Sequence, residues 1–127
     1  MGAPKISTAE SAVMEALWRK SPLSAEEIAA EVAEPQGWTL ATVKTLINRL
    51  LKKAAIGATP EGRRYLYHPL APRADWLAAE SKGLLDRLFD GRLAPMVSHL
   101  SQAKALTGDD IAALRKLIAE IDEEDAQ

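Results

Sequence analysis

The side chains best suited to chemistry lie between residues 39 and 53, in the stretch TLATVKTLINRLLKK. Helical spacing divides this stretch into an apolar face and a polar face that lacks any acid. The apolar face carries Val43, Leu46, Ile47 and Leu50. Apart from Ala41, the polar face carries hydroxyls, an amide and long cations: Thr42, Lys44, Thr45, Asn48, Arg49 and Lys52. Such side chains reach base edges and phosphates in a DNA major groove, so the pattern is typical of a helix that reads DNA.

The lengths of these side chains predict two kinds of DNA contact. We expect Thr42, Thr45 and Asn48 to contact bases, because short polar side chains donate or accept hydrogen bonds at base edges. We expect the long cations to position phosphates, which gives affinity without sequence information: Lys44, Arg49, Lys52 and Lys53. The alternatives are that the threonines are merely solvated and that Arg49 bridges to acids of the preceding helix.

A short hairpin is predicted after this helix. The runs 56–59 and 64–68 flank the sequence Pro60-Glu61-Gly62-Arg63, which is typical of a turn that contains glycine. The tip of the hairpin carries Arg63 and Arg64, which suit a contact with the minor groove or with phosphate. The alternative for both arginines is a solvated turn.

Capping signals mark the helices that must position this surface. Three pairs have the spacing in which a cap hydroxyl and an acid three residues later satisfy backbone amides: Ser7 with Glu10, Ser24 with Glu27, and Thr107 with Asp110. The first two pairs predict helices over residues 8–19 and 25–34. We expect the second of these helices to avoid DNA, because it is rich in glutamate.

The segment between the second and third helices contains two helix breakers. Residues 34–37 read Glu-Pro-Gln-Gly and predict a turn. Thr39 then caps the third helix, and Trp38 and Val43 have the spacing of a hydrophobic staple that fixes the angle of entry.

The C-terminal part of the chain predicts further amphipathic helices, the first starting near Pro72. These residues are too few for a sound independent core, so we expect a second copy of the chain to cover their apolar faces. The predicted dimer interface comprises Trp76, Leu77, Leu84, Leu85, Leu88, Phe89, Met96, Leu100, Leu114, Leu117, Ile118 and Ile121.

Together these elements predict a mostly α-helical fold in two parts. Residues 1–71 form a winged helix-turn-helix domain with a small β-hairpin wing, and residues 72–127 form a helical dimerisation domain. Each protomer of such a dimer presents its third helix to DNA. The two helices reach major grooves about one or two turns apart on one face of double-stranded DNA.

The distribution of charge supports a local anionic partner. The 127 residues carry a formal net charge of -2. Residues 39–68 contain six cations and one acid, whereas residues 71–127 contain seven cations and eleven acids. A basic block inside an acidic protein indicates local DNA binding and argues against general adhesion to nucleic acid or membrane.

Composition excludes several other classes of protein. The chain has no cysteine, which removes disulfides, zinc fingers and cysteine nucleophiles. His68 and His99 are far apart and lack obvious partner ligands, so we expect no metal site. No catalytic constellation is visible, and we expect neither enzymatic activity nor a cofactor. Without a signal peptide or a transmembrane stretch, a cytoplasmic location is expected, with no membrane insertion.

Several motifs in this order resemble the BlaI/MecI/CopY family of bacterial transcriptional repressors. They are IS-x-AE at 6–10, VMEALW at 13–18, W-T-x-x-TVKTL at 38–46, NRL-x-KK at 48–53, GRRYLYHPL at 62–70 and LLDRLF-x-G-x-LAP at 84–95. The resemblance implies a homodimeric winged-helix repressor that binds an operator with two inverted half-sites. It also implies release by a signal from a membrane-bound sensor protease, with β-lactam resistance as the usual target.

Three departures from the family pattern bear on regulation and specificity. The copper-responsive branch has a cysteine-rich tail, and the absence of cysteine excludes that mode of sensing. The antibiotic-responsive branch is cut at an Asn-Phe pair that aligns with His99-Leu100 here, so either cleavage uses a different sequence or regulation differs. Relatives commonly carry a lysine where this chain has Ala41, so we expect one contact to be missing and the operator to differ.

Two other functions are compatible with this sequence. A winged-helix module that docks a protein in place of DNA usually loses the cations of the third helix and the wing, which this chain keeps. A DNA binder gated by a small molecule needs an apolar pocket near the dimer interface, and the sequence neither shows nor excludes one.

Overall fold

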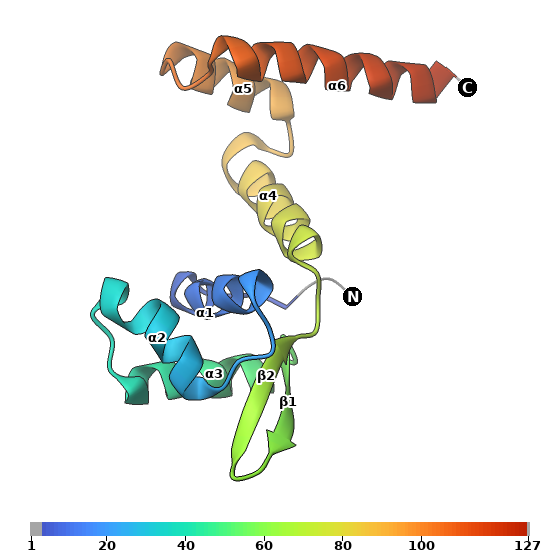
Figure 1. Cartoon of the computed structure of the whole chain (residues 1–127). Coiled ribbons are helices and arrows are strands. Elements are labelled where there is room, and N and C mark those ends of the chain that lie inside the picture. The colour runs from blue at the N-terminus through green and yellow to red at the C-terminus, as the bar shows by residue number, and fades with distance from the viewer. Residues whose placement is uncertain (1–3, 127) are drawn as a thin grey trace. The chain divides into compact units, whose positions relative to one another are not determined.

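A computed structural model of the chain describes residues 4–126 (Figure 1). The elements are α1 (Thr8–Arg19), α2 (Ala25–Gln36), α3 (Leu40–Lys52), β1 (Ile56–Glu61), β2 (Arg64–Pro69), α4 (Arg73–Phe89), α5 (Leu93–Gln102) and α6 (Gly108–Ala126). The predicted fold class is confirmed, because helices dominate and the two strands form one antiparallel hairpin. No helix within the described residues is long and apolar enough to cross a membrane.

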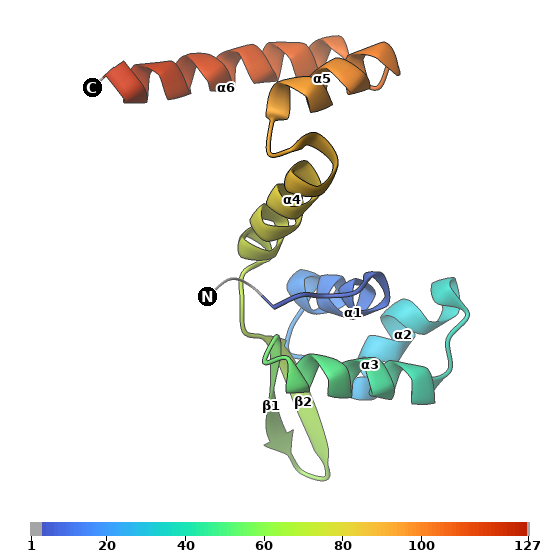
Figure 2. The same ribbon diagram turned by 180° about the vertical axis from the view of Figure 1, so that it is seen from behind.

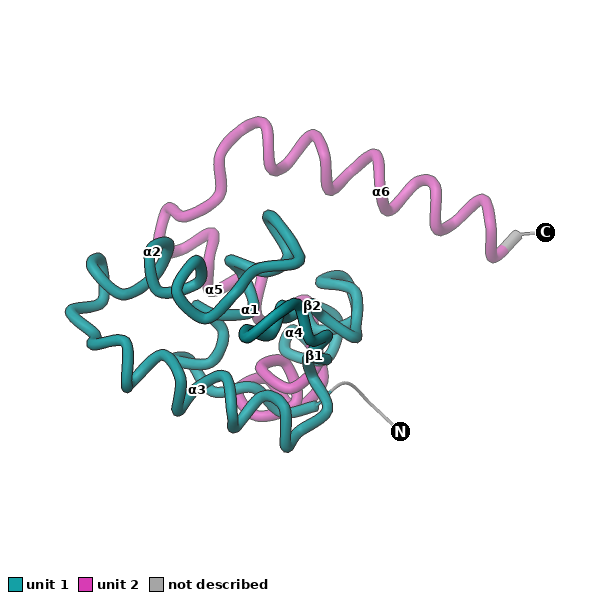
Figure 3. The backbone as a smooth tube through the Cα atoms, turned by 60° about the horizontal axis from the view of Figure 1, so that its bottom comes forward, with its two compact units in different colours: residues 1–81 teal, residues 82–127 magenta. Residues whose placement is uncertain are grey.

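The chain divides into two compact units (Figure 3). The first ends at Ser81 and the second begins at Lys82, so the division falls within α4. The start of α4 belongs to the first unit because Trp18 of α1 holds it. The Trp18 indole donates to the carbonyl of Ala71 at 3.0 Å and packs against Trp76, with ring centroids 5.4 Å apart.

Both N-terminal capping boxes form as predicted. The amide of Glu10 donates to Ser7 Oγ at 3.1 Å, and the amide of Ser7 donates to the Glu10 carboxylate at 2.8 Å. Ser24 and Glu27 make the equivalent pair of hydrogen bonds at the start of α2. These local bonds explain why both helices begin where the sequence predicted.

The predicted turn over residues 34–37 is wrong in part, because α2 continues through Pro35 to Gln36. Gly37 then ends the helix with φ 72°, a left-handed conformation that glycine adopts without strain. Its amide donates to the carbonyl of Glu34 at 3.1 Å, and the amide of Trp38 donates to Ala33 at 2.8 Å. This Schellman pattern closes the last helical turn despite the proline.

The core of the first unit lies among α1, α2 and α3. The apolar face of α3 supplies Val43, Leu46, Ile47 and Leu50, all buried. Burying each such side chain contributes roughly 1.5–3 kcal/mol, enough to fix the rotation of α3 about its axis. The opposite, polar face of α3 is thereby directed to solvent.

The wing is a tighter hairpin than the sequence predicted. The register runs from Ile56 opposite Pro69 to Glu61 opposite Arg64, so only Gly62 and Arg63 form the loop. Gly62 has φ 63°, as the first residue of a type II′ turn requires. Figures 1 and 2 show the hairpin extending from the core beside the C-terminal end of α3.

Candidate nucleic-acid interface

The exposed face of α3 brings together six predicted contact residues. Exposed side chains lie at Thr42, Lys44, Thr45, Asn48, Arg49 and Lys52. Within residues 4–126, none of the three cations of this set forms an ion pair. Among the described residues no ion pair joins Arg49 to an acid of α2, so the alternative in which Arg49 bridges to α2 finds no support. Unpaired cations on an acid-free surface are available to a polyanion.

The threonine hydroxyls of α3 are turned partly toward the protein. Thr39 caps the helix by accepting the amide of Thr42 at 3.2 Å, and the two hydroxyl oxygens are also 3.2 Å apart. Thr45 Oγ1 donates to the carbonyl of Ala41 at 3.1 Å. The hydroxyl hydrogen of Thr45 is therefore engaged within its own helix.

Lys53 differs from the other cations because the protein already binds its ammonium group. Lys53 Nζ donates to the carbonyl of Lys5 at 2.9 Å and to the carboxylate of Glu10, whose residue is only 1 % exposed. Burial raises the pKa of Glu10, but the hydrogen bonds from Lys53 and Ser7 outweigh burial and hold it below its ordinary value. The structure thus places Lys53 where it pairs a buried carboxylate.

The two wing arginines have different surroundings. Arg64 pairs with the Glu61 carboxylate at 2.9 Å, and this bond is the main reason why its pKa is raised. Arg63, in the loop itself, forms no ion pair within the described residues. Both arginines line a cleft of about 180 Å³ together with Lys44 of α3 and Glu26 of α2. The wing and α3 therefore present three cations to one concave surface, in which one acid of α2 also lies.

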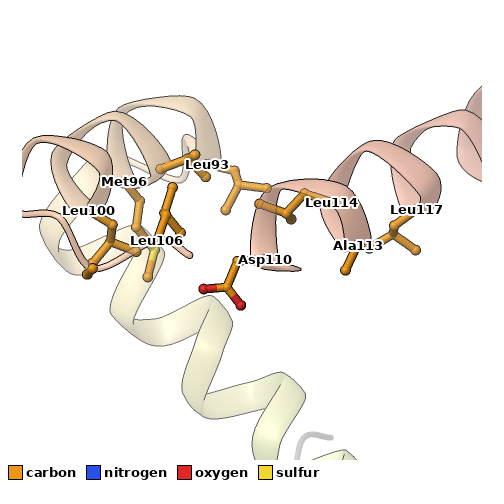
Figure 4. A pocket seen from close by; sticks show the side chains of 10 residues that line it. Leu93, Met96, Leu100, Leu106, Asp110, Ala113, Leu114 and Leu117 are labelled. Atoms are coloured by element: carbon orange, nitrogen blue, oxygen red, sulfur yellow. The ribbon is translucent and has the colours of Figure 1, made fainter. Parts of the chain in front are cut away.

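The second unit contains an open apolar groove of about 520 Å³ (Figure 4). Its lining comes from α5, α6 and the segment between them: Leu93, Met96, Val97, Leu100, Ala105, Leu106, Asp110, Ala113, Leu114 and Leu117. Four of these residues were predicted for a dimer interface: Met96, Leu100, Leu114 and Leu117. Farther along α6, the predicted Ile118 and Ile121 are exposed.

The remaining predicted interface residues lie on α4. Leu84, Leu85 and Phe89 are half-buried, whereas Leu77 and Leu88 are exposed. Trp76 is half-buried, but it packs against Trp18 and the core of its own chain. The tertiary structure therefore already gives Trp76 a partner without a second copy.

The two histidines occupy unrelated places. His68 lies at the base of the wing, where its ring comes close to Gly57: a Cβ at that glycine would lie 2.7 Å from His68 Nε2. His99 is exposed on α5, and the adjoining Leu100 lines the apolar groove. The residues that the structure describes contain no group of three or more side chains suited to hold a metal ion.

Sequence reasoning missed the residues that hold this surface in place. Glu10 was predicted only as a capping residue, and its pairing with Lys53 joins positions 43 residues apart. The contact of Trp18 with Ala71 was also not predicted. One signal could have identified Glu10: it is an acid on the face of α1 that otherwise carries buried apolar residues.

Comparisons with known proteins agree with this architecture. The family model described as penicillinase repressor matches residues 6–120. The penicillinase repressor of Bacillus licheniformis is 32% identical over 117 residues, covering 92% of this chain and 91% of that protein. The methicillin resistance regulatory protein MecI of Staphylococcus aureus (strain N315) is 30% identical over 114 residues, covering 90% and 93%.

Two solved structures each match more than half of the chain. The solution structure of the DNA binding domain of the repressor BlaI has a TM-score of 0.53 and 34% identity, covering 59% of this chain and 93% of that one. The monomeric form of Bacillus licheniformis BlaI in complex with the blaP half-operator has a TM-score of 0.51 and 34% identity, covering 57% and 89%. By sequence and by fold, this chain belongs to the penicillinase repressor family of transcriptional regulators.

Proposed function

We propose that this DNA-binding transcriptional repressor acts as a homodimer on an operator with two inverted half-sites. The observation that carries the proposal is the exposed, acid-free face of α3. Its cations form no ion pair among the described residues, and one of them, Lys44, lines a cleft with both wing arginines. The relative solved with a half-operator gives independent support for operator DNA as the ligand class. The protein acts in the cytoplasm, where bound repressor occludes promoter DNA.

The roles of the individual residues follow from the length of each side chain and from whether it is already paired within the protein. Thr42, Thr45 and Asn48 contact bases, whereas the unpaired cations Lys44, Arg49 and Lys52 bind phosphates. Arg63 at the wing tip binds the minor groove or a phosphate, with Arg64 beside it held by Glu61. Lys53 is not among the proposed DNA contacts, because its ammonium group is paired with Glu10.

A second copy of the chain covers the apolar groove of the second unit. This proposal is supported by a groove of about 520 Å³ and by exposed leucines and isoleucines along α6. Single soluble chains rarely expose large apolar patches without a binding partner. Dimerisation doubles the phosphate contacts, which makes operator affinity depend on the second unit.

Release from the operator follows from loss of the dimer. In the family pattern, a membrane-bound sensor protease provides the signal, and the aligned position is His99-Leu100. Cleavage there interrupts α5 inside the groove lining, which removes the surface proposed to hold the second copy. The regulated genes then become accessible because each separate DNA-binding unit retains only half of the contacts.

The direct test is binding to the promoter DNA upstream of the repressor's own gene, by gel shift across a salt series with random DNA as competitor. We expect tight binding that resists the competitor and weakens steeply as salt is raised. Equal, weak binding to the promoter and to random DNA would instead favour the protein-docking alternative or an operator elsewhere.

Adjacent lysines at the end of α3 give a matched test of the residue roles. Lys52→Ala should weaken operator binding and reduce the slope of log K against log salt by about 0.9 per protomer. Lys53→Ala should leave that slope unchanged, because the Lys53 ammonium group binds Glu10 and not phosphate. Gel shifts at four salt concentrations measure both slopes, at a temperature where circular dichroism finds both variants folded. A smaller slope for Lys53→Ala would mean that Lys53 does bind a phosphate of the operator.

A further inference from the structure

The three threonines at the start of α3 offer DNA few hydroxyl donors. Thr45 donates its hydroxyl hydrogen to the carbonyl of Ala41 at 3.1 Å. The hydroxyl oxygens of Thr39 and Thr42 are 3.2 Å apart, so one of them donates to the other. Two of the three hydroxyl hydrogens are therefore used inside the protein.

Two neighbouring positions of the outer face, which also carries Thr42 and Lys44, are left apolar. Ala41 and Thr45 are both exposed and, four residues apart, they lie one above the other on the helix surface. With its hydroxyl hydrogen committed to the backbone, Thr45 offers its γ-methyl group and the lone pairs of its oxygen. We call Ala41 and Thr45 the methyl patch.

The chemistry of the major groove selects one kind of base for such a patch. Guanine presents two acceptors there, which need donors from the protein, and the methyl patch has none to offer. Thymine presents its C5-methyl group, which packs favourably against alanine and threonine methyls. The N-terminal residues of a recognition helix are also those that usually meet base edges.

We propose that the methyl patch reads the C5-methyl group of a thymine in each half-site, and that Thr45 recognises this base through its methyl group and not through its hydroxyl. The inference rests on the proposed binding of α3 in the major groove. It makes Ala41 a specificity-determining residue, because its small apolar side chain leaves room for the thymine methyl.

A matched pair of variants separates the two halves of the Thr45 side chain. Thr45→Val keeps the methyl group and loses the hydroxyl, whereas Thr45→Ser keeps the hydroxyl and loses the methyl group. On an operator first obtained by selection from random DNA with the full-length protein, we expect Thr45→Val to bind more tightly than Thr45→Ser. We expect Thr45→Ser to bind roughly ten- to twenty-fold more weakly than wild type, about four-fold for each methyl group lost from the dimer. Thermal melts check that this exposed substitution leaves both variants folded.

Replacing thymine with uracil removes the same contact from the DNA side. Uracil in place of the thymine that faces the methyl patch should weaken wild-type binding by a factor similar to that expected for Thr45→Ser. The same change in the DNA should have little further effect on binding by Thr45→Ser itself. Stronger binding by Thr45→Ser than by Thr45→Val, or wild-type affinity for the uracil operator, would overturn the inference while leaving operator binding established. Failure of the selection to enrich any sequence would instead count against the proposed function.

Discussion

Replacing Leu117 with glutamate is expected to weaken operator binding by about 100- to 1,000-fold and to halve its salt dependence. Leu117 lines the apolar groove of the second unit and is 51% exposed in the single chain. A carboxylate there has to be desolvated when a second copy covers the groove, which strongly opposes association. Each freed protomer then binds one half-site alone, and the advantage of linking two binding events is lost.

Sedimentation equilibrium and gel shifts on the same samples measure this effect. Ala112→Glu is the matched control, because it adds the same charge to α6 at an exposed position outside the groove. The control should remain dimeric and should bind operator like wild type. Should Leu117→Glu stay dimeric with an unchanged salt slope, the groove would not be the dimer interface.

Replacing Glu10 with alanine should lower the free energy of unfolding of the first unit by about 2 kcal/mol, or roughly 8–16 °C in Tm. The substitution removes a capping hydrogen bond to Ser7 and leaves Lys53 without its carboxylate partner. The loss is kept moderate because the Lys53 side chain is 37% exposed and water replaces part of the lost interaction.

Urea unfolding monitored by tryptophan fluorescence measures this loss, with Glu15→Ala as the control. Glu15 lies on the same helix and pairs with Arg73 at 2.7 Å, but that pair is at the surface. We expect the control to change stability by no more than about 0.5 kcal/mol. Equal losses of unfolding free energy for both variants would mean that burial does not strengthen the ion pair between Glu10 and Lys53.

The contribution of Glu10 should also depend on pH with a defined sign. Its pKa in the folded protein is lowered from the ordinary value of 4.5, so folding favours the ionised form. The stability that Glu10 contributes is therefore fully present above about pH 4.5 and is lost as pH falls through the lower folded-state pKa. The difference in unfolding free energy between wild type and Glu10→Gln should shrink over that acidic range. A difference that stays constant down to pH 3 would contradict this linkage.

Local signals in the sequence determined most of the first unit. Capping boxes and helical spacing predicted the bounds of α1 and the buried face of α3, because both depend on residues three or four positions apart. The errors were also local in origin. Pro35 suggested an earlier end of α2, and the proline and glycine around Glu61 suggested a longer loop in the wing.

By itself, the sequence determined that one acid-free helix face would meet solvent and that the C-terminal helices would carry unpartnered apolar residues. Only the tertiary structure decided which cations are already paired within the protein, because Lys53 pairs with Glu10, 43 residues away in the sequence. It likewise decided that Trp76 packs on Trp18 within one chain. Periodicity predicts which side of a helix is buried, but the partner on that side depends on how distant helices pack, and no local pattern encodes that choice.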